Sequence, residues 1–342
     1  MSSIAIVTNS FSGGGAERSM NILANEFQGA GYETSLIAIN SGPEDIVARK
    51  CKTYCLGRNW KAGFSETLRF RTKFKELLND LQPDSLIINC ELPELLIALT
   101  STKAKIVVVE HASDPWRGRK ILGLVVRAIL IAKRVKWVAV SSDLKFWPGL
   151  SKFSSVIKNP VVKEYLFPPS AIPKSIKSPK LVFVGRLSEE KQPGMFVDIC
   201  KETKIPGVIF GDGPLRSEIE GRVKTENLDV DLRGFTTYPW AEVSDKDLVI
   251  VTSKNEGDGL VVAEAVMLGI SILLLDTPDL RRFDLPVNSY KKDVSDFCEN
   301  INSHVENGFQ ANRVDSKTQN SLSEQRLLGT IFSQWLKIIE SN

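Results

Sequence analysis

Apolar and polar positions along the chain follow two rhythms, one typical of strands and one of helices. Short apolar runs predict buried strands, and apolar residues spaced three or four apart predict helices. In the first half the predicted strands are residues 4–8, 34–39, 85–89, 105–109 and 137–140, and the predicted helices are 16–30, 65–81 and 118–133. This alternation predicts a parallel sheet wrapped by helices.

The second half repeats the alternation, with predicted strands at residues 180–184, 207–210, 229–232, 248–251 and 271–275. Between the halves lies a proline-rich stretch with Pro160, Pro168, Pro169, Pro173 and Pro179, which predicts a linker. We therefore expect an α/β fold with two Rossmann-like doubly wound domains facing a cleft. The expected N-terminal domain covers 1–160, the linker 161–179 and the C-terminal domain 180–322.

The last segment, residues 323–342, carries a broad apolar face at helical spacing. Its members are Leu327, Leu328, Ile331, Phe332, Trp335, Leu336 and Ile339. A helix with such a face docks on a neighbouring surface. Two surfaces are open to it: the second domain, or the first domain if the helix crosses back.

Length and composition agree with a two-domain globular protein. The chain has 342 residues, of which 42% are hydrophobic and 25% charged, and that length exceeds what one core usually serves. No apolar run reaches the roughly 18 residues of a membrane-spanning helix, and the N-terminus enters a strand without a signal-like segment. The five cysteines are scattered, so we expect reduced thiols in a cytoplasmic protein.

Charge is divided unequally between the halves. Residues 1–160 contain 22 Lys and Arg against 14 Asp and Glu, a net charge of +8, and the remainder contains 22 against 27, a net charge of −5. The basic half is therefore expected to face an anionic partner.

Candidate chemistry in the first half lies in two loops that follow predicted strands. Gly13, Gly14 and Gly15 open a helix after the first strand, where free backbone N–H groups favour an anion. The spacing is neither that of a dinucleotide fingerprint nor that of a Walker loop, so a simple tight turn is the alternative. His111 follows the strand at 105–109; it is either a ligand contact or a structural histidine.

In the second half, Arg186 and Lys191 lie just beyond the first predicted strand, behind Gly185. Two cations at that position would clamp a diphosphate, or they belong to a solvated basic loop. Gly211 and Gly213 follow the next strand and would let backbone approach a ligand closely.

The stretch EGDGLVVAEA, residues 256–265, places two carboxylates around a turn. Gly257, Asp258 and Gly259 fall at the start of a predicted helix, where amides favour an anion, while Glu256 and Glu264 would accept hydrogen bonds from hydroxyl groups. A nucleotide sugar offers both a phosphate and hydroxyls. The alternatives are a glycosidase acid/base pair and an ordinary helix cap with a surface glutamate.

Taken together, these motifs resemble those of the GT-B glycosyltransferases, specifically the retaining family 4. The resemblance spans most of the chain and is carried by GGGAERSMNILA, EHASD, VAVSSDL, IKNPV, VGRLSEEK, FGDGPLRSEI and EGDGLVVAEA. It implies that Arg186 and Lys191 grip the donor diphosphate, that Glu264 binds ribose hydroxyls, and that Glu256 with residues as far as Leu260 binds the transferred sugar.

The resemblance also implies that His111 contacts the sugar near the reacting centre and that Gly14 and Gly15 face the diphosphate or the acceptor. The last helix would cross back to the first domain. Asp258 departs from the family pattern, in which an aromatic or another apolar residue is common, so the donor sugar cannot be copied from a relative.

The implied function is retaining transfer of a hexose or N-acetylhexosamine from a nucleoside diphosphate sugar to a glycan or lipid-linked acceptor, in surface polysaccharide or glycolipid synthesis. A UDP-sugar is favoured over GDP-mannose. No metal or other cofactor is expected, because the two Asp-x-Asp spellings at 229–231 and 245–247 fall at or before strand starts. The alternatives are a nucleotide-sugar epimerase and a non-catalytic sugar-nucleotide binding protein.

Cations beside apolar residues predict an anionic membrane surface as a further partner of the first domain, with the protein bound peripherally. One group surrounds residues 121–131 and comprises Arg117, Arg119, Lys120, Arg127, Lys133, Arg134 and Lys136. The other interleaves Arg69, Arg71 and Lys73 with Trp60, Phe64, Leu68, Phe70 and Phe74. The alternative is a core helix with solvated ends. Nucleic acid is not expected, since no nucleic-acid module is present.

Overall fold

The computed structural model describes residues 2–11, 14–42, 50–60, 63–168 and 179–341. The chain divides into two compact units, the first made of Met1–Pro160 with Leu328–Asn342 and the second of Val161–Leu327. Most of the predicted linker, residues 169–178, lies outside the described residues. The first unit is thus discontinuous in sequence, and the second is inserted into it.

The first unit is built on a parallel sheet that has seven strands in its described residues, in the order β3-β2-β1-β4-β5-β6-β7. The strands are β1 (Ser3–Thr8), β2 (Glu33–Asn40), β3 (Lys52–Arg58), β4 (Ser85–Asn89), β5 (Lys105–Glu110), β6 (Lys136–Ala139) and β7 (Ser155–Val156). Its helices are α1 (Gly15–Gly29), α2 (Phe64–Leu81), α3 (Glu91–Ala98), α4 (Lys120–Ala132) and α11 (Leu328–Glu340).

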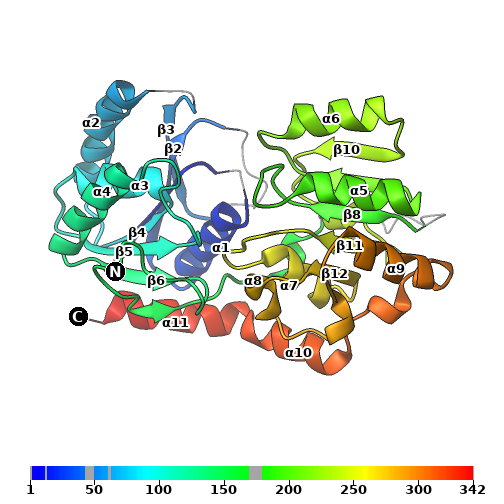
Figure 1. The fold of residues 1–342 in the computed structure, drawn as a ribbon. Helices are drawn as coiled ribbons and strands as arrows, with labels where there is room; N and C mark the ends of the chain where they lie inside the picture. The colour runs from blue at the N-terminus through cyan, green and yellow to red at the C-terminus, as the bar shows by residue number, and fades with distance from the viewer. Residues whose placement is uncertain (1, 12–13, 43–49, 61–62, 169–178, 342) are drawn as a thin grey trace. The chain divides into compact units, whose positions relative to one another are not determined.

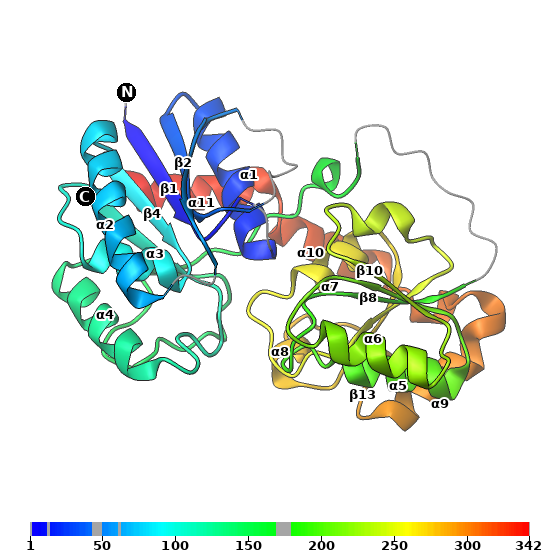
Figure 2. The ribbon, with the colours of Figure 1, turned by 90° about the horizontal axis from the view of Figure 1, so that it is seen from above.

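Both faces of the inner strands β1, β2, β4 and β5 are largely buried, which explains why these strands are almost continuously apolar. Along β1, Ile4 and Ile6 join the core on one face with α1 and α11. Ala5 and Val7 join the core on the other face with residues of α2, α3 and α4. In Figure 2, α2, α3 and α4 lie on one side of the labelled strands β1, β2 and β4, and α1 and α11 lie on the other.

The last helix, α11, packs on the first unit. Ile331, Trp335 and Ile339 enter the same core as Ile4 and Ile6, and the rings of Phe27 and Phe332 meet edge to face with centroids 5.1 Å apart. In addition, the Tyr32 hydroxyl donates to Glu340 Oε1 at 2.7 Å, and Lys136 Nζ donates to the Ser341 carbonyl at 2.8 Å. Figure 1 shows α11 in red beside the sheet. The expectation that the last helix returns to the first domain is confirmed.

The second unit repeats the plan with a parallel sheet that has six strands in its described residues, in the order β10-β9-β8-β11-β12-β13. The strands are β8 (Leu181–Val184), β9 (Gly207–Phe210), β10 (Val230–Gly234), β11 (Leu248–Val251), β12 (Ser271–Leu275) and β13 (Tyr290–Lys291). The helices are α5 (Pro193–Thr203), α6 (Arg216–Thr225), α7 (Leu260–Met267), α8 (Pro278–Arg281), α9 (Val294–His304) and α10 (Ser316–Gln325). Two parallel doubly wound sheets confirm the predicted α/β class.

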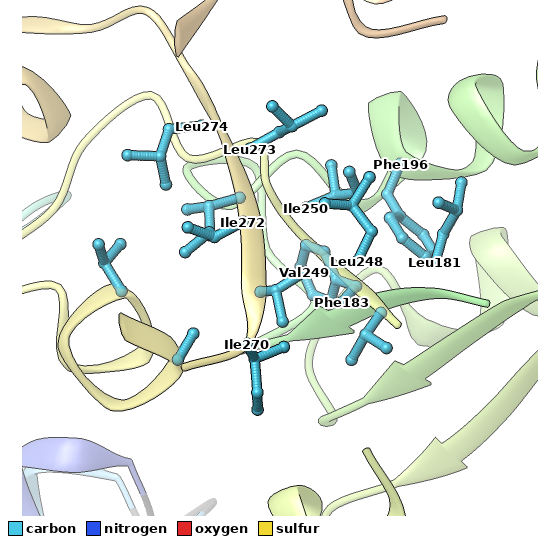
Figure 3. Packing of buried hydrophobic residues seen from close by; sticks show 14 of the residues in the cluster. Leu181, Phe183, Phe196, Leu248, Val249, Ile250, Ile270, Ile272, Leu273 and Leu274 are labelled. Carbon is cyan, nitrogen blue, oxygen red and sulfur yellow. The ribbon is translucent and has the colours of Figure 1, made fainter. Parts of the chain in front are cut away.

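Branched aliphatic and aromatic side chains fill the core of the second unit. Figure 3 shows residues of β8, β11 and β12, such as Phe183, Ile250 and Ile272, packed together with Phe196 of α5. Two of the surrounding helices have an aspartate as N-cap. The Asp293 carboxylate, at the start of α9, accepts from the Asp296 amide, and the Asp315 carboxylate, at the start of α10, accepts from the Thr318 amide, both at 3.0 Å. Such caps satisfy the amides of a first helical turn.

Some elements were not predicted, and their sequences show why. Strand β3 lies at an edge of the sheet and leaves several of its residues exposed, so it lacks a continuous apolar run. Helix α3 has only eight residues with a proline among them, and it begins after Cys90, whose φ is +78°. Strands β7 and β13 have two residues each, too few for a periodic signal.

Helix α4 exposes apolar side chains on its outer side. Ile121, Leu124 and Val125, which we name the α4 stripe, are 83%, 42% and 51% exposed, while Val126 and Leu130 are buried. Arg127 and Phe74, both predicted to belong to a membrane-facing surface, are fully buried, so that part of the expectation is wrong. None of the described helices is long and apolar enough to span a bilayer.

Candidate active site

In the second unit, the loops that carry the predicted donor residues leave adjacent strands. Strands β8 and β11 pair in parallel, with Leu181 opposite Leu248, at the point where the strand order reverses direction. Ligands of open α/β sheets bind at such points, beyond the carboxyl ends of the strands. The loop after β8 carries Arg186 and Lys191, and the loop after β11 carries Glu256.

Two glycines let the neighbouring loop approach the Arg186 loop very closely. A Cβ atom on Gly211, whose φ is +146°, would lie 1.8 Å from the Gly185 carbonyl oxygen, and one on Gly213 would lie 2.4 Å from the Leu187 carbonyl oxygen. The close approach expected at Gly211 and Gly213 therefore exists, but its partner here is protein backbone. Their contact with a ligand stays a prediction.

Lys191 and Glu256 form the centre of the site. Lys191 Nζ lies 2.5 Å from Glu256 Oε1, and the Ser253 hydroxyl donates to the same oxygen at 2.8 Å. The Lys191 side chain is 24% exposed and that of Glu256 only 9%, so the cation faces solvent more than its partner does. Arg186 is exposed on the same loop as Lys191.

Hydrogen bonds to backbone carbonyls tie the two loops together. The Thr252 hydroxyl donates to the Lys191 carbonyl at 2.7 Å, and the Lys254 amide donates to the Glu190 carbonyl at 2.8 Å. The position of Lys191 relative to Glu256 is thus fixed by the main chain as well as by the ion pair.

The turn at residues 256–259 delivers the start of α7 to this site. Gly259 is the N-cap, with φ +65°, and a Cβ atom there would lie 2.5 Å from Phe283 Cζ, so glycine is required. The Glu256 amide donates to Asp279 Oδ2 at 2.8 Å. Free amides at a helix N-terminus favour an anion. The N-terminus of α7 follows the turn that contains Glu256, the partner of Lys191.

Glu264 lies about one turn into α7 and is buried. Its Oε2 accepts a hydrogen bond from Trp240 Nε1 at 2.7 Å. Trp240 belongs to a short 3-10 helix, Pro239–Glu242. The indole therefore orients the carboxylate. Contact of Glu264 with ribose hydroxyls, which the resemblance implies, stays a prediction.

Asp258, in the same turn, faces an arginine that the sequence did not single out. Arg326 Nη1 and Nη2 donate to Asp258 Oδ2 and Oδ1, each at 2.8 Å. Both carboxylate oxygens of Asp258 therefore accept hydrogen bonds from the guanidinium. Contact of Asp258 with a substrate stays a prediction.

In the first unit, Gly14 is the N-cap of α1 and Gly15 its first residue. A Cβ atom on Gly14 would meet nothing closer than Glu17 Oε2 at 3.8 Å, so packing within the unit does not require glycine there. Gly13 lies outside the described residues.

His111 directly follows Glu110, the last residue of β5. Glu110 belongs to a buried ionic cluster that we name the Arg127 cluster, made of Arg127, Glu94 and Glu110. Arg127 Nη2 donates to Glu110 Oε2 at 2.5 Å and to Glu94 Oε1 at 3.0 Å. Glu110 Oε1 accepts from the Ala112 amide at 3.0 Å, which fixes the backbone on the far side of His111. The cluster therefore anchors the His111 loop.

Burial controls the titration of this cluster. It raises the pKa of Glu94 to about 7, although Arg127 opposes the rise, and it also raises the pKa of Glu110. Trp116 Nε1 donates to Glu94 Oε2 at 3.0 Å as a further partner.

Comparison with known proteins shows which proteins the chain resembles in sequence and in fold. Residues 169–283, which lie within the second unit and include both loops of the site, match the model of glycosyl transferases group 1. The fold aligns over 100% of both chains with the crystal structure of Anabaena Alr3699/HepE in complex with UDP and glucose, with a TM-score of 0.80 and 18% identity. The chain has the GT-B fold, and its second unit carries a region that matches glycosyl transferases group 1.

Two curated glycosyltransferases are similar to this chain in sequence. A poly(ribitol-phosphate) alpha-N-acetylglucosaminyltransferase of Staphylococcus aureus is 25% identical over 182 residues, which are 49% of this chain and 37% of that protein. An alpha-1,4-N-acetyl-D-galactosaminyltransferase of Campylobacter jejuni, which acts on a diNAcBac-PP-undecaprenol-linked saccharide by its name, is 26% identical over 288 residues, 78% of this chain and 77% of that protein.

Several residues that shape the candidate site were missed from sequence. Trp240, Asp279 and Arg326 each contact a predicted site residue, yet they lie 24, 23 and 68 positions away from it. Only Ser253, three residues before Glu256, was close enough in sequence to suggest a contact.

Proposed function

We propose that this glycosyltransferase moves a hexose or N-acetylhexosamine from a nucleoside diphosphate sugar to a glycan or lipid-linked acceptor, in surface polysaccharide or glycolipid synthesis. The observation that carries the proposal is the contact between Lys191 and Glu256 at the β8/β11 switch point, beside the start of α7. The cation suits a diphosphate, while the carboxylate and the amides at the start of α7 suit the hydroxyl groups of a sugar.

Each site residue has one role in this proposal. Arg186 and Lys191 bind the diphosphate, the turn from Glu256 to Leu260 binds the transferred sugar, and Glu264 binds the ribose. His111 contacts the sugar, and Gly14 with Gly15 faces the diphosphate or the acceptor. These roles come from the resemblance in motif, and the charges of Lys191 and Glu256 agree with them.

The proposed reaction proceeds with retention of the anomeric configuration and without a metal. The bond from the sugar C1 to the donor phosphate oxygen breaks, and the acceptor hydroxyl oxygen bonds to C1 on the same face. A donor phosphate oxygen takes the acceptor proton. Negative charge grows on the departing diphosphate, and preorganised cations at Arg186 and Lys191 stabilise it.

Relatives support the choice of substrates. The Anabaena structure holds UDP and glucose, which favours a UDP-sugar over GDP-mannose. The two curated relatives transfer N-acetylhexosamines by name, one to a polyol-phosphate polymer and the other to an undecaprenol-linked saccharide.

A donor panel followed by product analysis tests the proposal. Thermal shifts with UDP- and GDP-sugars identify the donor, and incubation with soluble glycans and pyrophosphoryl-lipid-linked sugars then shows the reaction. We expect free nucleoside diphosphate and, from an α-linked donor, an α-linked product by NMR. An epimerised donor, or binding without turnover, would overturn the transfer reaction, and a β-linked product would overturn retention.

We further propose that the first unit contacts an anionic membrane surface and that the protein is peripheral on the inner face of the membrane. The α4 stripe is exposed, and exposed cations accompany it in the chain at Arg117, Arg119 and Arg134. Apolar side chains beside cations suit a headgroup layer, each cation contributing about 1 kcal/mol. The +8 charge of residues 1–160 agrees with such a surface.

A further inference from the structure

The pair formed by Asp258 and Arg326 joins the turn at residues 256–259 to a distant segment of the same unit. Besides its two contacts with the carboxylate, Arg326 Nη2 donates to the Asp258 carbonyl at 3.1 Å. Asp258 is 8% exposed and Arg326 2%. Three charge-assisted hydrogen bonds in a buried setting fix both the side chain and the backbone of Asp258.

Arg326 lies where the chain passes between the two units. It follows α10 and precedes α11, and the unit boundaries fall after Pro160 and after Leu327. The Arg326 carbonyl accepts from the Val161 amide at 3.3 Å, so both connecting segments meet at this residue. The guanidinium therefore links these segments to the turn that precedes α7.

The same turn is held from its other side by α8 and the residues after it. Asp279 Oδ2 accepts from the Glu256 amide at 2.8 Å, and Arg282 Nη1 donates to the Glu256 carbonyl at 3.3 Å. Glu256 is thus fixed from one side and Asp258 from the other. Removing Arg326 would therefore release Asp258, which precedes the amides at the start of α7, and would leave the contacts of Glu256 in place.

We infer that Arg326 is a positioning residue for the sugar-binding turn, acting through Asp258 to hold the amides at the start of α7 in place. This inference rests on the proposed function. Asp258 stands two residues from Glu256 and directly before the N-cap Gly259, so its displacement moves the groups on both sides. Displacements of about 1 Å near a reacting centre cost on the order of 10²-fold in rate.

A purely stabilising ion pair is the competing account, and the two differ in what they change. Loss of one partner of a buried pair destabilises a protein wherever the pair lies. If Arg326 positions the turn, its loss also slows sugar transfer. The sugar-free nucleotide still binds, because on the proposed function its diphosphate is bound by Arg186 and Lys191 on the other loop.

The experiment compares Arg326→Lys and Asp258→Asn with the unchanged protein. Lysine keeps the charge but cannot form two parallel bonds to a carboxylate, and asparagine keeps the volume of Asp258. Arg313→Lys is the matched control, because Arg313 makes a surface ion pair with Asp245 in the same unit. The readouts are kcat and KM for the nucleotide sugar, the Kd of the nucleoside diphosphate, and amide hydrogen exchange over residues 256–261.

We expect Arg326→Lys to lower kcat/KM by about 10- to 100-fold, to change the nucleoside diphosphate Kd by less than about twofold, and to speed exchange in the turn. Asp258→Asn should show the same pattern to a smaller extent, and it carries the test if Arg326→Lys does not fold. Arg313→Lys should match the unchanged protein.

Normal kinetics and normal exchange with lowered thermal stability alone would overturn the inference, as would a parallel loss of nucleoside diphosphate affinity. Failure of the proposed function looks different: the unchanged protein would then neither bind a nucleotide sugar nor transfer one. In that case hydrogen exchange still decides whether Arg326 holds the turn.

Discussion

At the scale of single residues, the contact between Lys191 and Glu256 sets two proposed roles against each other. The ammonium group is 2.5 Å from the carboxylate, although the first is assigned to the diphosphate and the second to the sugar. On these proposed roles, an arriving diphosphate would compete with Glu256 for Lys191 and would release the carboxylate to accept from hydroxyls. Donor binding would thereby be coupled to preparation of the sugar site.

Loss of either donor cation should slow turnover strongly. Arg186→Ala and Lys191→Ala are expected to lower kcat by about 10²- to 10³-fold, as loss of one oxyanion donor does, because the charge on the departing diphosphate loses a stabilising partner. Steady-state kinetics with the preferred donor measures this. Lys224→Ala, at an exposed position of α6, is the control. Near-normal rates in both variants, or an absolute need for Mg²⁺, would contradict the assignment.

Glu94 should make the stability of the protein depend on pH. Its pKa is raised from 4.5 to about 7 in the folded protein, so the folded state binds a proton that the unfolded state has released. The free energy of unfolding therefore falls as pH rises from about 4.5 to about 7, by roughly 3 kcal/mol for such a shift. Glu94→Gln carries no charge at any pH and should lose the part of this slope that Glu94 contributes, while Glu110, whose pKa is also raised, keeps its own.

Chemical denaturation at several pH values between about 5 and 8 measures the slope. Glu76→Gln, on the exposed side of α2, should keep the slope of the unchanged protein. Equal slopes in Glu94→Gln and the unchanged protein would show that Glu94 titrates normally, and that Arg127 offsets the cost of burial.

Residues with a local signal were predictable from sequence, and residues with a distant partner were not. Lys191 and Glu256 could be found because each follows a strand closely, with glycines beside it. Arg326 gives no such signal, because its partner is 68 positions away. Arg127 misled the prediction: a cation in an apolar run suggests a surface, whereas two acids from β5 and α3 neutralise it inside the core.

At the scale of elements, α11 supplies core to a unit whose other elements lie far earlier in the chain. Trp335 is 3% exposed, and its replacement by alanine leaves a large cavity. We expect Trp335→Ala to lower the free energy of unfolding by about 3–5 kcal/mol, measured by denaturant unfolding. Gln334→Ala, on the exposed side of the same helix, should change it little. Equal stabilities would mean that α11 adds nothing to the core.

Helix α4 is the element that decides the membrane proposal. Sedimentation with vesicles of anionic lipid should show binding at low salt that weakens as salt rises. Replacing the α4 stripe with Ile121→Ser, Leu124→Ser and Val125→Ser should reduce binding, and so should neutralising Arg69, Arg71 and Lys73. Val287→Ser, a 76% exposed position of the second unit, is the control. Absence of binding at low salt would favour a soluble acceptor.

Strands buried on both faces were predictable because their apolar runs are continuous. Strands 85–89, 207–210, 248–251 and 271–275 have the predicted bounds. Strand β3 lacks such a run because it lies at an edge and leaves most of its residues exposed, and helix α3 was missed because it has only eight residues. The elements that were missed are thus those whose burial is partial or whose length is short.

At the scale of the whole molecule, both sheets follow the same strand order about their first and fourth strands. That repetition is visible in sequence as a repeated rhythm, so the presence of two doubly wound sheets was predictable. The surface chosen by the last helix was not, because an apolar face specifies burial and not its partner. Its partner is set by long-range packing with residues such as Phe27.

The discontinuity of the first unit has a consequence for biosynthesis. Residues of α1, β1 and β4 leave the ribosome early, but the face they share with Ile331, Trp335 and Ile339 remains open until α11 has been made. The second unit is continuous, so all of its chain is available before α11 is complete. Domains usually close in the order of synthesis; here the later unit can close first, and the nascent first unit presents uncovered apolar surface to chaperones throughout translation of residues 161–327.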